Sequence, residues 1–194
     1  MPVMTEELDE PRIYEIADYG KPLPRVMNPL RAYRVLDGNA SLFGMPHPSI
    51  LKEIDRKQLF AQLYEDGVRY LINLTKENSG ASYSDRILLS SFCPVTDQGP
   101  KGAIEKTMLL SGVDSAVAAL KNGEGVAIHC WGGTGRTGTA IGCILRKLGK
   151  GSGVEIVNWL GELNQRRERH WPESPVQAEV VRECQPGEDF FDRL

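Results

Sequence analysis

The sequence has no excess of positive charge and no long apolar run. Its 23 Lys and Arg residues are outnumbered by 26 Asp and Glu residues, which gives a net charge of −3 for 194 residues. An acidic chain of this kind has no general attraction for nucleic acid or for an anionic membrane, so neither is an expected partner. Any anion that the protein binds must therefore be held by a local arrangement of residues.

Apolar stretches are short throughout the chain. None approaches the roughly 18 residues that a membrane-spanning helix needs. The first residues, MPVMTEELDEPRIYEIADYG, carry acidic groups where a signal peptide would carry basic ones. A hydrophobic fraction of 41% with 25% charged residues is ordinary for a soluble globular protein. We therefore expect a cytoplasmic protein.

Closely spaced cysteine pairs are also missing. The sequence contains four cysteines and no C-x-x-C pair, and no histidine cluster accompanies them. A zinc site is therefore not expected, and we predict neither a metal nor another cofactor. In a reducing compartment the four side chains should be free thiols. They are Cys93, Cys130, Cys143 and Cys184.

Strand and helix patterns alternate through most of the chain. Residues 1–30 contain five prolines and no sustained periodicity, so we expect an extended or partly ordered N-terminal arm before one domain of residues 31–194. The alternation predicts a three-layer α/β domain with a short, mostly parallel central sheet of four or five strands flanked by helices. Strands are expected within 33–45, 68–75, 86–95 and 125–130, and helices within 50–67, 104–122, 136–149, 151–170 and 174–184.

The segment HCWGGTGRTG, residues 129–138, allows two interpretations. Gly133, Gly135 and Gly138 match the G-x-G-x-x-G spacing of dinucleotide-binding loops. That fold needs a further strand that ends in an acidic residue about 20 residues on, whereas Glu155 lies inside an amphipathic helical segment. A nucleotide P-loop would need a lysine that is missing here. Both nucleotide interpretations are therefore disfavoured.

The second interpretation is an anion site between a strand and a helix. Cys130 ends the expected strand, and the helix is expected to begin at Arg136. Glycines at 132, 133 and 135 permit a curl that exposes successive N–H groups to one centre. The helix N-terminus adds a positive field, and Arg136 adds a bidentate donor for phosphate oxygens. Because such a field favours a thiolate over a thiol, we predict that Cys130 is a nucleophile.

This loop resembles the H-C-x5-R-[ST]-G signature of the protein tyrosine phosphatase superfamily. The chain from about Tyr33 to Gln177 resembles its compact dual-specificity members, particularly bacterial ones whose loop also begins H-C-W-G-G. The resemblance implies a phosphatase catalytic domain at 31–194 that works without metal through a phosphocysteine intermediate on Cys130. The phosphate would be bound by Trp131, Gly132, Gly133, Thr134, Gly135 and Arg136.

The resemblance also implies a general acid on a loop upstream of the cysteine. Asp97, in CPVTDQGP, lies 33 residues before Cys130 and follows an expected strand. It would protonate the leaving oxygen and then activate the water that hydrolyses the phosphocysteine. By the same comparison, Thr137 would give its hydroxyl to the sulfur, and His129 would hold the loop through its ring N–H.

Several residues remain open. Trp131 lies either at the mouth of the site or beneath it. Some related enzymes place a water-positioning glutamine after the last catalytic helix, which makes Gln177 an accessory candidate. The segment from Ser174 to Gln177 is nevertheless better explained as a capping box with proline at the first helical position. Residues 166–170, RRERH, are interpreted as a solvated helix end.

Two further cysteines are candidates for a reversible disulfide with Cys130 that would protect it from over-oxidation. Cys143 lies two helical turns beyond the loop and is disfavoured. Cys93 is the better candidate, because its strand precedes the acid loop and is expected to neighbour the Cys130 strand.

The expected substrate is a phosphorylated protein or peptide, with phosphotyrosine favoured and phosphoserine or phosphothreonine open. Enzymes that accept inositol phosphates or phosphoinositides tend to carry lysines in this loop, and the uncharged residues here disfavour that alternative. A non-catalytic phosphoprotein-binding pseudophosphatase is disfavoured because both Cys130 and Asp97 are present. The oligomeric state and the physiological substrate are not predicted.

Overall fold

The protein is represented by a computed structural model that describes residues 12–13, 32–37, 39–76 and 89–187. The predicted N-terminal arm, residues 1–30, lies outside the described residues except for β1 (Arg12–Ile13). The described residues contain no helix with the length and apolar character needed to cross a membrane.

A six-stranded, mostly parallel sheet forms the centre of the domain, in the order β1-β2-β3-β6-β4-β5. The pairs β3–β6, β6–β4 and β4–β5 are parallel, whereas β1–β2 and β2–β3 are antiparallel. The mostly parallel sheet is confirmed, and the two-residue β1 adds a strand to the five within 32–187. These five are β2 (Tyr33–Asp37), β3 (Leu42–Met45), β4 (Val68–Thr75), β5 (Leu89–Val95) and β6 (Gly125–His129).

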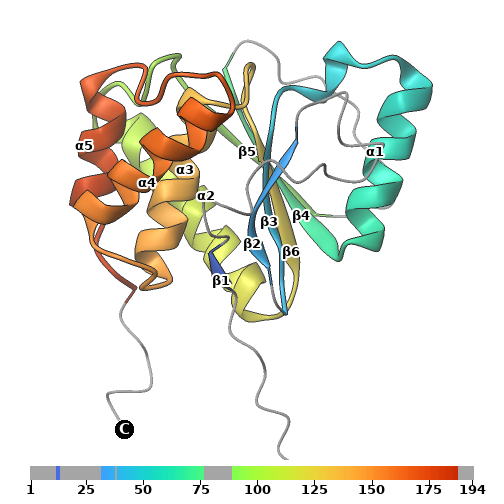
Figure 1. Cartoon of the computed structure of the whole chain (residues 1–194), viewed down its shortest axis with the longest axis horizontal. Helices are drawn as coiled ribbons and strands as arrows, with labels where there is room; N and C mark the ends of the chain where they lie inside the picture. The colour runs from blue at the N-terminus through green and yellow to red at the C-terminus, as the bar shows by residue number, and fades with distance from the viewer. Residues whose placement is uncertain (1–11, 14–31, 38, 77–88, 188–194) are drawn as a thin grey trace, which may run out of the picture.

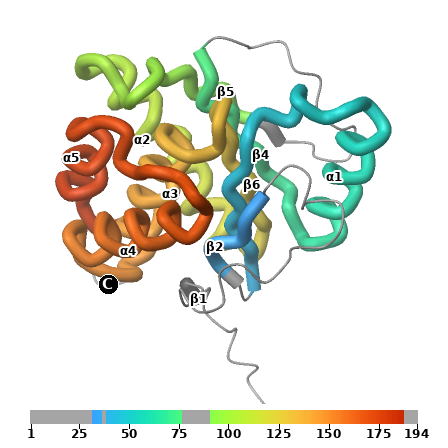
Figure 2. The backbone as a smooth tube through the Cα atoms, turned by 45° about the horizontal axis from the view of Figure 1, so that its top comes forward, coloured from blue at the N-terminus to red at the C-terminus, as the bar shows by residue number. Residues whose placement is uncertain are grey.

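Helices cover both faces of this sheet, so the predicted three-layer architecture is confirmed. One helix, α1 (Glu53–Glu65), lies alone on one face, and four helices lie on the other (Figures 1 and 2). Strands covered on both faces have buried residues in succession rather than in alternation, and all five residues of β6 are buried. The four helices are α2 (Gly102–Lys121), α3 (Gly135–Lys147), α4 (Gly153–Arg166) and α5 (Pro175–Glu183). A short 3-10 turn, η1, spans Pro48–Ile50.

The carboxyl ends of the parallel strands define the functional edge of the sheet. At the end of β6, His129 lies opposite Met45 of β3 and Asn73 of β4. Strand β5 runs in the same direction and ends at Val95, beyond β4. The loops that follow β6 and β5 therefore emerge at one edge, where α/β sheets commonly bind their ligands.

Candidate active site

The cysteine loop, residues 130–135, connects β6 to α3. Cys130 directly follows β6 and is 3% exposed, and α3 begins at Gly135 with Arg136 in its first turn. The first turn of a helix leaves main-chain N–H groups without intrahelical partners. Cys130, Gly135 and Arg136 line one pocket, so the positive end of the helix lies beside the cysteine.

Two side chains from distant segments hold the carbonyl of Gly133. The Tyr33 hydroxyl donates to it at 3.0 Å, and the Arg167 guanidinium donates to it at 3.3 Å. Arg167 also lies 3.8 Å above the Tyr33 ring. Gly133 has a φ of +71°, and a Cβ there would lie 2.5 Å from the Met45 carbonyl carbon. A side chain is therefore excluded, and Arg167 is part of the loop's support rather than of a solvated helix end.

Other carbonyls of the loop are bound from outside as well. The His47 amide donates to the Trp131 carbonyl at 3.0 Å, and the Trp171 indole N–H donates to the Gly135 carbonyl at 3.2 Å. Among the described residues, no main-chain amide from Trp131 to Gly135 donates a hydrogen bond to the protein. A row of amides with this arrangement is suited to binding an anion.

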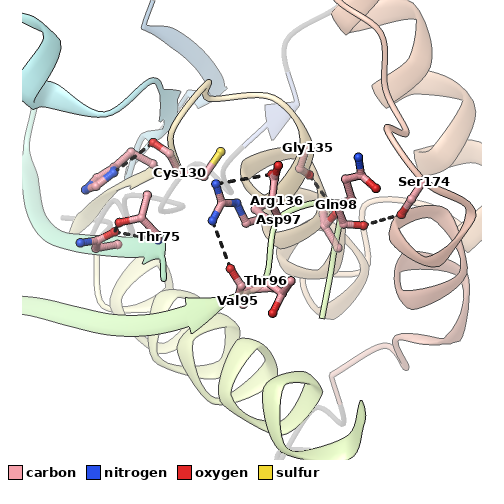
Figure 3. Close-up of polar contacts among 12 residues, drawn as sticks. Thr75, Val95, Thr96, Asp97, Gln98, Cys130, Gly135, Arg136 and Ser174 are labelled. Carbon is pink, nitrogen blue, oxygen red and sulfur yellow. Dashed lines mark hydrogen bonds and ion pairs between the residues drawn. The ribbon is translucent and has the colours of Figure 1, made fainter. Parts of the chain in front are cut away.

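Arg136 joins the cysteine loop to the loop that carries Asp97. Its side chain is buried, and Nη1 donates to the Val95 carbonyl at 3.1 Å. Its Nη2 lies 3.6 Å from Oδ1 of Asp97, whose side chain is 66% exposed. Figure 3 shows the guanidinium between these two partners, with the Cys130 sulfur on the same loop. The structure thus brings the predicted nucleophile, anion ligand and general acid together.

The acid loop, residues 96–101, is held at both ends by one carboxylate of α2. Glu105 accepts hydrogen bonds from the amide and hydroxyl of Thr96, from the Lys101 amide and from Lys76 Nζ. Burial by itself would raise the pKa of Glu105, but these donors lower it from 4.5 to about 2. Sequence reasoning missed Glu105. Its one signal was an acidic residue in the first helical turn after a turn-rich loop.

A pocket of 370 Å³ lies between the two loops. Trp131 is 52% exposed at this pocket, so it lies at the mouth of the site rather than beneath it. Glu173, from the segment before α5, also reaches the pocket and was not identified from the sequence. The lining residues are Asp97, Cys130, Trp131, Gly132, Gly135, Arg136 and Glu173.

The predicted capping box at the start of α5 is wrong in its side-chain contacts. Ser174 is the N-cap and Pro175 follows it, as expected, but the Ser174 hydroxyl donates to the Gln98 carbonyl instead of capping α5 (Figure 3). The buried Gln177 side chain accepts from the Glu173 amide at 2.7 Å. The Ser174 hydroxyl thus connects the start of α5 to the acid loop.

The amide nitrogen of Gln177 is buried and has no hydrogen-bond partner among the described residues. It would lie 2.6 Å from a Cβ on Gly135, so it faces the first turn of α3. A buried donor without a partner is costly, by about 1–3 kcal/mol. Gln177 therefore lies close enough to the cysteine loop to remain an accessory candidate.

His129 lies beneath the cysteine loop in a buried histidine pair. Its ring meets His47 edge-on at 4.8 Å between centroids, and its Nδ1 lies 3.4 Å from the Cys130 carbonyl. Burial, followed by His47 and Arg136, lowers the pKa of His129 to about 3. The ring is therefore neutral at neutral pH. It contacts the cysteine loop, which the sequence analysis expects it to hold.

Thr137 is buried in the first turn of α3. Its hydroxyl has no hydrogen-bond partner among the described residues, so the expected bond to the Cys130 sulfur is not present in this structure.

The cysteines lie differently from the expected arrangement. Strand β4 separates β5 from β6, so Cys93 is not on a strand adjacent to that of Cys130. Its sulfur faces α2 instead, 2.6 Å from where a Cβ on Gly112 would be. A hydrogen bond between Cys143 and Cys184, together with burial, raises the pKa of Cys143, whereas this bond lowers that of Cys184 to about 7. Cys93 and Cys143 therefore contact other parts of the protein, and none of the four cysteines forms a disulfide.

The described residues contain no group of three or more His, Cys, Asp or Glu side chains placed to hold a metal ion.

Several solved structures match this fold. TpbA of P. aeruginosa matches with a TM-score of 0.58 and 17% identity over 79% of this chain and 84% of that chain. Human DUSP28 matches with a TM-score of 0.56 and 15% identity over 74% and 87%. PTPMT1 in complex with PI(5)P matches with a TM-score of 0.57 and 19% identity over 75% and 90%. These likenesses show that the chain has a phosphatase fold of the dual-specificity type.

A family model identifies the group more closely. The model of the polymorphic toxin system DSP-PTPase phosphatases, Tc-R-P, matches residues 43–150, which is more than half of the chain. The chain belongs to this family.

Proposed function

We propose that the protein is a metal-independent phosphomonoester hydrolase that removes phosphate from phosphotyrosine in proteins or peptides. The observation that carries this proposal is the row of amides from Trp131 to Gly135, which lack protein acceptors among the described residues and lie beside Cys130 and Arg136. Residues 31–194 form the catalytic domain in this proposal.

Binding and the first step follow from this arrangement. The amides of the cysteine loop and the Arg136 guanidinium bind the equatorial phosphate oxygens, which aligns the phosphorus with the Cys130 sulfur. The thiolate attacks phosphorus, and the bond from phosphorus to the substrate oxygen breaks. Asp97, 3.6 Å from Arg136 at the pocket, gives its proton to that departing oxygen.

The second step regenerates the enzyme. The Asp97 carboxylate takes a proton from water as its oxygen attacks the phosphocysteine, and the sulfur leaves as thiolate. Thr137 donates its hydroxyl to that sulfur, and Gln177 orients the water from its position beside Gly135. His129 supports the loop as a neutral ring and transfers no proton.

An aromatic substrate is favoured by the exposed Trp131 ring at the pocket mouth, against which a phosphotyrosyl ring can pack. A cysteine-to-serine variant of TpbA, which shares this fold, has been crystallised in complex with pTyr. The PI(5)P complex of PTPMT1 makes phosphoinositides the alternative to test. Among the described residues that line the pocket, Arg136 is the single cation, which offers little to a polyanionic head group.

A direct assay tests the proposal. Phosphate release is measured from a phosphotyrosyl peptide, its phosphoseryl counterpart and a short-chain phosphoinositide, with chelator present throughout. We expect turnover of the phosphotyrosyl peptide in chelator, inhibition by vanadate and loss in Cys130→Ser. Turnover that survives this substitution would refute the mechanism, and turnover confined to the phosphoinositide would refute the substrate class.

A further inference from the structure

The active-site pocket has a cationic floor and an acidic rim. The floor carries Arg136, which is 3% exposed, next to the amides of the cysteine loop. The rim carries two acidic side chains, Asp97 and Glu173. Asp97 already has a place in the proposed reaction, so Glu173 is the charged residue of this pocket that lacks a function.

Glu173 is held in place by a segment tied to both catalytic loops. Its amide donates to Gln177, and the neighbouring Trp171 donates to the Gly135 carbonyl. Ser174 on its other side bonds to Gln98 of the acid loop. A Cβ on Gly135 would lie 1.8 Å from Glu173 Oε2, so the carboxylate lies directly against the first residue of α3.

The Glu173 carboxylate itself is unpaired. Among the described residues, none donates a hydrogen bond to it or forms an ion pair with it. A carboxylate beside a phosphate site repels any second negative charge on the substrate and attracts a positive one. Glu173 is exposed and lines the pocket, so a positive group on a bound substrate can reach its carboxylate.

We propose that Glu173 is a specificity-determining residue that favours phosphotyrosyl peptides with a lysine or arginine next to the phosphotyrosine. The same carboxylate disfavours substrates with a second anionic group at that place, including phosphoinositide head groups. This inference rests on the proposed phosphatase function and adds a preference among its substrates.

The test compares substrates of equal length and opposite charge. The value of kcat/KM is measured for a phosphotyrosyl peptide flanked by arginines, for the same peptide flanked by glutamates, and for a neutral aryl phosphate. The variants are Glu173→Gln, which keeps the side-chain shape, and Glu173→Lys. Glu162→Gln is the matched control, because Glu162 is an exposed glutamate of α4 that does not line the pocket.

The ratio of the basic to the acidic peptide is the readout. Relative to wild type, we expect this ratio to fall about fivefold in Glu173→Gln and roughly 20-fold in Glu173→Lys, as for one and two units of charge at a partly exposed pair. Glu162→Gln should keep the wild-type ratio. High salt should reduce the wild-type ratio, since the interaction is electrostatic.

Two results would overturn different parts of this account. If the aryl phosphate is hydrolysed but Glu173→Gln keeps the wild-type ratio, the specificity role of Glu173 is wrong and the phosphatase function stands. If wild type hydrolyses none of the substrates, the proposed function is wrong. In that case, the dissociation constants of both peptides are measured with Cys130→Ser and with the double variant Cys130→Ser/Glu173→Gln. If the preference for the basic over the acidic peptide is unchanged by Glu173→Gln, the role of Glu173 is wrong. A fivefold fall in this preference supports it.

Discussion

The cysteine loop and the acid loop are built on different physical principles although they share one pocket. Most residues of the cysteine loop are buried, and donors from several elements hold its carbonyls, as Tyr33 and Arg167 hold Gly133. The acid loop is more exposed, and the Glu105 carboxylate holds both of its ends. The first loop is thus supported from several elements, whereas the two ends of the second depend on one side chain.

In the proposed reaction, this difference separates the roles of the two loops. Support of the cysteine loop affects every substrate equally, because each substrate must place its phosphate there. Support of the acid loop affects only substrates whose leaving group needs a proton. The dependence of each variant on the leaving group therefore distinguishes the two loops.

The largest effect is expected for the proposed nucleophile, Cys130. Cys130→Ser should lower kcat by at least about 10⁴-fold with every substrate, because the phosphocysteine can no longer form. Steady-state phosphate release measures this, and Cys93→Ala is the control, since Cys93 faces α2 away from the pocket. Comparable losses in both variants would mean that folding rather than chemistry is affected.

Substitution of the proposed general acid, Asp97, should give a smaller and selective loss. Asp97→Asn should lower kcat about 10²- to 10³-fold for aryl phosphates with poorly acidic phenols, and far less for strongly acidic ones. A series of substituted aryl phosphates measures this slope. Asp114→Asn, at an exposed aspartate of α2 paired with Lys147, should leave it unchanged. An equal loss across the series would show that Asp97 does not protonate the leaving group.

The buried histidine beneath the cysteine loop predicts a pH dependence of stability. His129 has a folded pKa of about 3 and an ordinary value of 6.5, so between these values only the unfolded chain holds the proton. The free energy of unfolding should therefore fall as pH drops below 6.5, by up to about 1.4 kcal/mol per pH unit. Urea unfolding from pH 7 to 4 measures this, and His129→Asn should flatten the slope while His170→Asn should not.

Loosening of the acid loop should have a moderate effect. In wild type, main-chain amides of the acid loop donate to a carboxylate oxygen of Glu105. In Glu105→Gln an amide NH₂ replaces one of the two oxygens and cannot accept, so the loop loses part of its hydrogen bonding. We expect about a tenfold fall in kcat for poorly acidic phenols and little change for strongly acidic ones. The substituted aryl phosphate series tests this, with Glu162→Gln as the control. An equal fall in kcat across the series would show that Glu105 does not support the position of Asp97.

The smallest effect is expected at the outer support of the cysteine loop. Tyr33→Phe removes one hydrogen bond to the Gly133 carbonyl, worth about 1 kcal/mol, so kcat/KM should fall about fivefold. This fall should be the same for every leaving group. Tyr64→Phe on α1 is the control, because Tyr64 lies outside the pocket. A fall restricted to poorly acidic phenols would remove the distinction between the two loops.

Much of the fold could be predicted because its signals are local. The apolar run of β4 was predicted with its observed bounds, 68–75, because its residues are neighbours in the chain. The order of strands in the sheet is not local. It places β4 between the strands of Cys93 and Cys130, which the sequence alone did not indicate.

The candidate site divides in the same way. Cys130, Arg136 and the glycines between them lie within seven consecutive residues, so their chemistry could be inferred from their spacing. Arg167 could not be assigned from the charged helix end in which it occurs. Its contact with Gly133 spans 34 residues of chain, and that distance is closed only when α4 packs beside α3.

The sequence by itself determined the sheet-and-helix alternation and the cysteine loop, because strand, curl and helix start are encoded by neighbouring residues. Only the tertiary structure decided which charged side chains lie beside the cysteine loop and the acid loop. Glu105 and Glu173 reach the two loops from α2 and from the segment before α5. A side chain's electrostatic partners depend on distance in space, and the packing of the helices on the sheet sets that distance.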